Sequence, residues 1–510
     1  MPSWLQSLLV KKRTTKIHEL HTTHTKQFTS RQPLQKPDRR GGRAATHSSP
    51  ENDGVEFATA FEAKLFQGGY LLSESQKLRT LKRFLAIAAV WHVAFVLAVF
   101  VVGRAQLAPN TLDRNGIGLS FAIDTHSYRI EAEDMAKLLR ELRIRDWAKY
   151  NASFHVKLYS LSFAVAGDVL GRNILGAEPL NLLYYLLILA LTYGIAWEAF
   201  DEKVALLAGT VVALWPSLLL HTTQLLRDAL FIPSMLLLAL ALLLIVNRDL
   251  SLKQGLLVAV AGAFGVLMVW LCRGDSWEIV LAIVILGAAV SALAQARKRR
   301  FSAGGTLAIA LMLLLTAAIP RFVPNYRQSD NPAPSATSGQ PELNTAFHAR
   351  WSIARRVALL RHKFIVSYPL AGSNIDTEVE LRDAADVIRY LPRAALIGFC
   401  APFPNMWFTR GEQVGRPGRL IAGAEMLLLY GVIGLAGLAL LRQYRRLSIL
   451  LLLGIASAGC IALGCVVVNI SSLYRMRYAY FILIIILGMK GLLILLPART
   501  RAKGTSPVGV

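Results

Sequence analysis

Asp124 is the acidic residue of this chain that is best placed for chemistry. It lies in the polar stretch 103–154, directly after the first strongly hydrophobic segment, in the text FAIDTHSYRIEAEDMAKLLRELR. A carboxylate, an aromatic residue four positions later (Tyr128) and an amphipathic helix follow one another there. Ionisable groups at a membrane surface are costly to place, so each is a candidate for function. A carboxylate can take a proton from an attacking hydroxyl, and we expect Asp124 to be such a base.

Two alternatives to a catalytic Asp124 stay open. Asp is common at helix N-termini, so the residue could cap the segment that follows it. Four other acids of the loop compete for the same role: Asp113, Glu131, Glu133 and Asp134.

Arginines form the second group of candidates, because a guanidinium binds phosphate with a rigid, permanently charged fork. Arg227 and Asp228 head one hydrophobic run, Arg273 lies between two runs in LCRGDSW, and Arg475 and Arg477 precede the last run in YRMRYAYF. Structural alternatives also stay open. Arg227 and Asp228 could form an ion pair that only stabilises the fold, and Arg475 and Arg477 could anchor their helix at the membrane surface.

Hydrophobic segments dominate the 510 residues, of which 54% are hydrophobic. About 20 apolar residues in a helix cross a bilayer core of about 30 Å. The fold class is therefore an all-α, polytopic bundle with about ten spans. We place them at 84–102, 179–198, 204–222, 228–246, 254–271, 277–294, 306–320, 419–441, 447–468 and 479–496.

Basic clusters set the topology, because Lys and Arg concentrate in cytoplasmic loops. With both termini inside, the clusters QARKRR (295–300), RQYRR (442–446) and PARTRAK (497–503) all become cytoplasmic. The segment 155–171, HVKLYSLSFAVAGDVLG, is short and carries Lys157 and Asp168, so we expect an interfacial or re-entrant helix. The predicted location is the inner (plasma) membrane.

Two extracytoplasmic loops result, and both should carry interfacial helices. In the second we expect a surface helix over 350–364 and a helix within 381–407 that breaks at Pro392. We predict five divisions. The first two are a basic cytoplasmic tail that ends in a surface helix (1–80) and a bundle that includes the first loop (81–320, with the loop at 103–178). The others are the second loop (321–418), the last spans (419–498) and a short tail (499–510).

The remaining composition excludes several classes. The net charge of +24 is accounted for by topogenic loops, and no nucleic-acid motif accompanies it, so we expect no nucleic-acid partner. The cysteines form no C-x-x-C pair, so no disulfide framework or zinc site is implied. His18, His21 and His24 lie in the polar tail without acidic or Cys partners, and a solvated tail explains them.

The order of these features resembles the membrane-embedded C-type glycosyltransferases, in particular bacterial protein O-mannosyltransferases and aminoarabinose transferases. One span, a loop with an acid and an aromatic four later, interfacial helices and a bundle occur in that order. The matching residues are Asp124 and Tyr128, Lys157 and Tyr159 in HVKLYS, Arg227 and Asp228 in LLRDALFI, and Arg475 and Arg477. The Asp-Glu pair of many relatives is absent, since Thr125 follows Asp124.

The resemblance implies an inverting enzyme that moves a sugar from a polyprenyl-phosphate donor in the membrane to an envelope glycan, lipid or protein. It implies Asp124 as base and the other matching residues, with Arg273, as substrate contacts. Whether a divalent metal lies near the first-loop acid stays open. Two other classes also stay open: an O-antigen polymerase or ligase, whose chemistry would lie in the loop 321–418, and a transporter or flippase.

Overall fold

The computed structural model describes two stretches of the chain in detail, with short gaps. These are residues 74–108, 118, 124–323, 353–367, 369, 371–409, 411 and 415–496. The chain divides into two compact units, Met1–Ile87 and Ala88–Val510. The predicted histidine-bearing tail, Asp113, Arg350 and the C-terminal tail lie outside the described residues.

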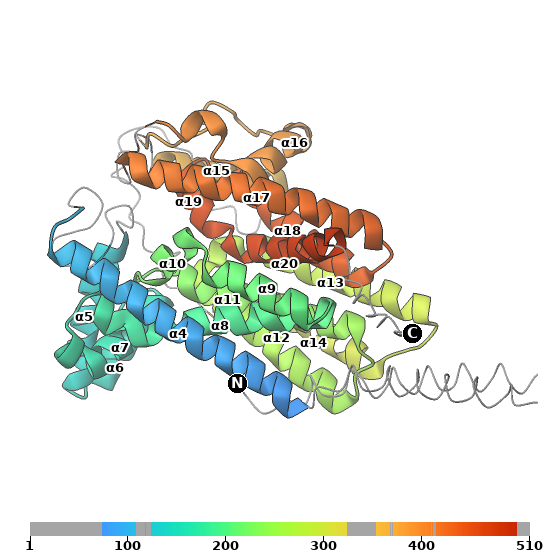
Figure 1. Cartoon of the computed structure of the whole chain (residues 1–510), viewed down its shortest axis with the longest axis horizontal. Coiled ribbons are helices and arrows are strands. Elements are labelled where there is room, and N and C mark those ends of the chain that lie inside the picture. Colours follow the sequence, from blue (N-terminus) through green and yellow to red (C-terminus); the bar gives the residue numbers. More distant parts are fainter. Residues whose placement is uncertain are drawn as a thin grey trace, which may run out of the picture. The chain divides into compact units, whose positions relative to one another are not determined.

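The described part is all-α, as predicted, and contains two isolated β-bridges but no strand. Its α-helices are α4 (Glu74–Arg104), α5 (Asp124–Arg140), α6 (Ile144–Lys149), α7 (Phe154–Leu170), α8 (Ile174–Ala199), α9 (Glu202–Ala213), α10 (Pro216–Thr222), α11 (Asp228–Asn247), α12 (Leu252–Arg273), α13 (Trp277–Lys298), α14 (Ala303–Phe322), α15 (Ile353–Ser367), α16 (Ala384–Cys400), α17 (Gly415–Gln443), α18 (Leu447–Val466), α19 (Ile470–Met476) and α20 (Tyr478–Leu495). Figure 1 shows their arrangement.

Eight helical runs in the described residues are long and apolar enough to cross a membrane. One of them, Leu252–Lys298, contains α12 and α13, which reverse direction at the short 3₁₀ turn Gly274–Ser276. Arg273 contacts Asp228 at the start of α11, whereas Lys298 contacts Asn247 at its end. All ten predicted spans therefore coincide with helices, and the chain is a multi-pass membrane protein.

The predicted span 204–222 is not one straight helix. It consists of α9 and α10, which are bent by 65° relative to each other. Trp215 is extended (φ −68°, ψ 112°) and precedes Pro216. A proline disfavours helical geometry in the residue before it and cannot donate the backbone hydrogen bond of a helix interior. The Trp-Pro step therefore causes the break, and the prediction of a continuous span was wrong.

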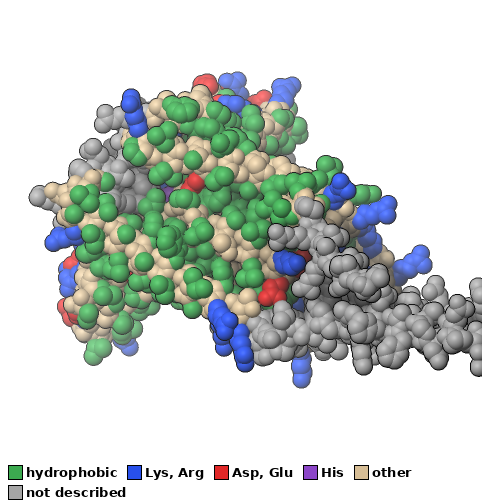
Figure 2. Space-filling model, in the orientation of Figure 1, with side chains coloured by type: hydrophobic (Ala, Val, Ile, Leu, Met, Phe, Trp, Pro, Cys, Tyr) green, Lys and Arg blue, Asp and Glu red, His purple; other side chains and the backbone are tan. Residues whose placement is uncertain are grey.

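Two basic clusters lie together at one end of the bundle. Arg297 donates to the carbonyl of Arg445 (3.3 Å), so the clusters 295–300 and 442–446 meet at the end where α11 finishes. The Asp228–Arg273 contact marks the opposite end. On the face shown in Figure 2, hydrophobic side chains cover most of the middle, and Lys and Arg lie toward the borders. The assignment of the cytoplasmic side stays a prediction.

Helix α7 is the segment that we expected to be interfacial. It packs against α5 and α8 and lies with α5 and α6 at one side of the bundle (Figure 1). Phe163 and Tyr159 are fully buried, whereas Val165 and Val169 on the other face are 85% and 86% exposed. A helix with one packed face and one bare apolar face is suited to lie in the membrane surface.

The second loop contains helices α15 and α16, as predicted, with two differences. Pro392 lies inside a continuous α16, so the expected break is absent; the carbonyl it leaves without a donor belongs to Ile388, which is 65% exposed and accessible to other donors. Arg361, within the predicted surface helix 350–364, is buried and donates to the carbonyls of Asp376, Val379 and Cys465. It fastens the loop to the end of α18.

Glycines allow α16 and α18 to pack in close contact. A Cβ on Gly464 would lie 2.0 Å from the carbonyl oxygen of Ala394, whereas one on Gly434 of α17 would meet nothing within 4 Å. We expect Gly464→Ala to destabilise the protein by about 1–3 kcal/mol through overpacking. The matched control Gly434→Ala should not. Thermal unfolding in detergent checks this, and equal stability of both variants would contradict the packing.

Asp376 accepts from Arg393 (2.9 and 3.0 Å) and Tyr390 (3.0 Å). The Arg393 hydrogen bond, opposed by burial, holds the pKa of the Asp376 carboxyl below its ordinary 3.8. Its contribution to stability is thus complete above pH 3.8 and declines as the pH falls toward the lowered native pKa. We expect Asp376→Asn to lower the free energy of unfolding at pH 7 by less than about 1 kcal/mol, because the pair is partly exposed. The difference, measured by thermal unfolding, should shrink as the pH falls below 3.8; a difference that stays constant would contradict the prediction.

Candidate functional site

Asp124 and Arg475 lie next to each other although 351 positions separate them. Asp124 begins α5, and Arg475 lies in α19, just before the last span. Their ion pair is 3.6 Å long, with the Asp124 side chain 35% exposed and that of Arg475 15% exposed. The contact is loose, with no hydrogen bond between the two groups in the described structure. The two ends of the sequence pattern therefore meet, as expected, at one place.

A second, fully buried ion pair lies beside the first. Asp228 at the start of α11 accepts from Arg273 at the end of α12, and both side chains are 3% exposed. Asp228 also interacts electrostatically with Arg475 and Arg227. The expected pairing of Arg227 with its neighbour Asp228 is replaced by Arg273, because consecutive residues of a helix point in different directions.

Arg227 joins the same group of charges. Burial alone lowers the pKa of its guanidinium, but Tyr128 and nearby carboxylates outweigh burial, and the pKa lies above its ordinary value. The carboxylates that act on it are those of Asp275, Asp228 and Asp124. Three arginines and three acids thus form one charge cluster at this end of the bundle: Arg227, Arg273, Arg475, Asp124, Asp228 and Asp275.

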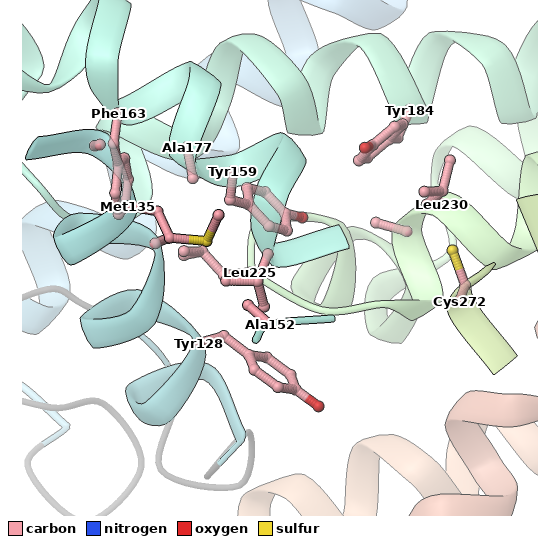
Figure 3. Close-up of a cluster of buried hydrophobic side chains, with 14 residues drawn as sticks. Tyr128, Met135, Ala152, Tyr159, Phe163, Ala177, Tyr184, Leu225, Leu230 and Cys272 are labelled. Carbon is pink, nitrogen blue, oxygen red and sulfur yellow. The ribbon is translucent and has the colours of Figure 1, made fainter. Parts of the chain in front are cut away.

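A hydrophobic core joins the elements that carry this cluster. Buried side chains of α5, α7, α8, α11 and α12 pack together, among them Met135, Phe163, Tyr184 and Leu230 (Figure 3). The core continues through Leu225 of the turn that precedes α11. Since this packing orders the start of α5 and the start of α11 together, it positions Asp124 relative to Asp228.

Tyr128 lies at the edge of that core. Its ring packs edge-on against His155 at 4.5 Å, and Figure 3 shows its hydroxyl pointing away from the other labelled side chains. It contributes to the electrostatic surroundings of Arg227 in the charge cluster. The role of Tyr128 as a substrate contact stays a prediction.

Lys157 lies away from the charge cluster. It donates to the Ala148 carbonyl (2.8 Å) and lies over Trp147, so it connects α7 to α6, and partial burial lowers its pKa. Tyr159 is fully buried, and its hydroxyl donates to Asn181 Oδ1 (2.7 Å) and to the Gln224 carbonyl (3.1 Å) in the turn before Arg227. Tyr159 therefore connects α7 to the turn that leads into the cluster.

Arg477 does not point toward Asp124. It is completely buried, donates to the carbonyl of Gly398 (3.1 Å) and lies over the rings of Phe481 (4.3 Å) and Tyr474 (5.0 Å). Residues two apart in a helix face opposite sides, so only one of the two late arginines can meet the first loop. Arg477 joins α16 to α20, and the expectation that both arginines share one pocket is not met.

Several polar residues that sequence reasoning missed are buried in the membrane helices. Glu425 of α17 accepts from Ser217 and Tyr474, and His92 of α4 contacts Glu178 of α8 at 2.9 Å. Asp275 adds a third acid to the charge cluster. The signal was available for the two glutamates, because an acid inside an apolar run marks function. His221 is packed, as expected, with Nδ1 2.5 Å from the Ser217 carbonyl.

No group of three or more His, Cys, Asp or Glu side chains suited to a metal ion occurs among the residues that the structure describes. The chemistry of the cluster is that of carboxylates and guanidiniums. Arg273 Nε and Nη1 are buried without a hydrogen-bond partner in the described structure. Buried donors of this kind are costly unless something accepts from them, so the cluster is suited to a bound anion.

Comparisons with known proteins add little. No protein-family model matches the chain, and no sequence of a curated protein matches it. Among solved structures, it is similar to the archaeal oligosaccharyltransferase AglB from Archaeoglobus fulgidus, in complex with an inhibitory peptide and a dolichol-phosphate. The identity is 12% and the TM-score 0.38, over 79% of this chain and 50% of that chain. The chain thus spans half the length of that protein, and a likeness at this level assigns no function to it.

The buried ion pair yields a stability prediction. Arg273→Met leaves the Asp228 carboxylate without the partner that donates to it, and breaking a buried pair typically costs about 3–5 kcal/mol. The double variant Asp228→Asn, Arg273→Met removes both charges and should recover most of that loss. Thermal unfolding of the purified variants measures it; a double variant less stable than Arg273→Met alone would contradict the pairing.

Proposed function

We propose that this chain is an inverting membrane glycosyltransferase that moves a sugar from a polyprenyl-phosphate donor to a hydroxyl of an envelope glycan, lipid or protein. The observation that carries the proposal is the meeting of Asp124 and Arg475 at 3.6 Å, beside the Asp228–Arg273 pair. The reaction needs a base for the acceptor and cations for the departing phosphate on the same side of the bilayer. This cluster contains both.

Each group has a distinct role. The acceptor oxygen bonds to C1 of the sugar from the side opposite the phosphate, the acceptor proton passes to Asp124, and the C1–O bond to phosphate breaks. The negative charge that grows on the phosphate is stabilised by Arg475, Arg227 and the free donors of Arg273. Because the Asp124–Arg475 contact is loose, an arriving phosphate can compete for Arg475 and leave the carboxylate free to accept the proton.

Removal of the base is the direct test. We expect Asp124→Asn to lower sugar transfer by about 10²–10⁴-fold, the usual contribution of a general base, in membranes supplied with a polyprenyl-phosphate sugar. The matched control is Asp134→Asn, an acid of the same helix that pairs with Lys137 and is half-exposed; it should retain activity. Equal amounts of folded protein must be shown by size-exclusion chromatography.

The same assay separates the ligase alternative, in which the second loop does the chemistry. Arg355 and Arg382 are exposed there, and Arg382 pairs with Glu380 at 2.9 Å. If alanine at these two positions abolishes transfer while Asp124→Asn is fully active, the base assignment falls and the second loop becomes the site.

A transporter is the second candidate, and one observation favours it. The break between α9 and α10 and the buried Glu425 are features of transporters, which bind substrates at interrupted helices and intramembrane acids. Purified protein in vesicles discriminates: a transporter moves polyprenyl phosphate across the bilayer and forms no glycosidic bond.

A further inference from the structure

Glu425 is a carboxylate inside a membrane helix, and it is 3% exposed. Its Oε1 accepts from the backbone N–H of Ser217 (2.7 Å), and its Oε2 accepts from the Ser217 hydroxyl (2.6 Å) and from the Tyr474 hydroxyl. No ion pair to Glu425 occurs in the described part of the chain. All its contacts are therefore with neutral donors.

Those donors belong to two segments that contain, or lead directly to, residues of the charge cluster. Ser217 lies in the first turn of α10, directly after the Trp-Pro break, and α10 leads through a short turn to Arg227 and Asp228. Tyr474 is the residue before Arg475 in α19. One carboxyl group thus joins the broken span, the long helix α17 and the segment that carries the late arginine.

The contacts fit a carboxylate. Its two oxygens receive three donors, from the Ser217 backbone, the Ser217 hydroxyl and the Tyr474 hydroxyl, and a carboxylate has four lone pairs to accept them. An ionisable group in a membrane interior is costly and is retained where it serves function. A charge-assisted hydrogen bond to Tyr474 holds α19, and with it Arg475, near Asp124.

We propose that Glu425 is a positioning residue: anchored by Ser217 at the start of α10, its carboxylate holds Tyr474 and thereby directs Arg475 to the place where a lipid-linked phosphate binds. The proposal rests on the proposed function and adds the residue that sets the geometry of its phosphate site. Glu425 acts through its neighbours and touches no substrate.

The test is a double-variant cycle on phosphate binding, with undecaprenyl phosphate as the probe and the full-length protein in nanodiscs. We expect Glu425→Gln and Tyr474→Phe each to raise the Kd about 10-fold, the loss of one hydrogen bond to a charged group. In the Arg475→Ala background neither change should raise the Kd by more than about 2-fold, because the cation that they position is gone.

Two controls separate positioning from general loss of stability. Tyr430→Phe removes a hydroxyl from α17 that donates to the Cys400 carbonyl. Glu198→Gln disturbs a buried acid that pairs with Arg248 at the opposite end of the bundle. Both should leave the Kd unchanged, even where Glu198→Gln lowers the unfolding temperature.

The outcomes distinguish this inference from the proposed function. The role of Glu425 alone is overturned if Glu425→Gln binds like the parent, or if it raises the Kd as much in the Arg475→Ala background as in the parent. Both proposals are overturned if the parent does not bind undecaprenyl phosphate.

Asp124→Asn should bind undecaprenyl phosphate at least as tightly as the parent. If this variant remains active in transfer while the double-variant cycle gives the expected result, Asp124 is not the base, and Glu425 remains the positioning residue.

Discussion

The constraint on which this structure depends is that a charge taken into a membrane protein must find a partner there. Asp228 and Arg273, each 3% exposed, satisfy it for each other, and the cost of either charge alone makes the pair close. Their contact fixes the start of α11 against the end of α12. Asp124, Arg227 and Arg475 then gather around a charge-balanced centre, where cations and carboxylates coexist without long-range repulsion.

A second consequence of burying polar groups in a membrane protein is that hydrogen bonds between distant helices fix the orientation of those helices. Most of the bundle is held by apolar contacts, and several helix pairs approach closely at glycine, as α16 and α18 do at Gly464. Such contacts set distances but allow small slides, because lipid-facing apolar surfaces carry little directional preference. The hydrogen bonds of Glu425 to Ser217 and Tyr474 add direction, and they do so at the two segments that form the charge cluster.

The sequence predicted what depends on local composition. Every predicted span is helical because runs of apolar residues identify membrane helices regardless of the partners they acquire. The bend between α9 and α10 could also have been predicted, because Trp215 precedes a proline. The apolar residues on both sides of this step suggested one continuous span instead. The continuity of α16 through Pro392 could not be predicted, because it depends on how exposed one carbonyl is.

The site was predictable only as a set of candidates, because pairing depends on three-dimensional contacts. The sequence indicated an acid near its start and arginines near its end at one membrane face, and the structure brings Asp124 to Arg475. The sequence could not predict which of the arginines would contact Asp124. Arg475 and Arg477 differ by two positions, and helix geometry sends them to opposite sides.

The loose Asp124–Arg475 pair is also the feature that gives the cluster a way to respond to a ligand. Arg475 is one of three arginines balanced by three acids, so a phosphate that enters adds negative charge and must compete for a guanidinium already in use. The Arg273–Asp228 pair is buried and hydrogen-bonded, and exchanging its partner would leave an isolated charge in the interior. The half-exposed pair is the cheaper one to open. Under the proposed function, anion binding would therefore release the carboxylate of Asp124 before that of Asp228, and this would couple phosphate binding to the availability of the proposed base.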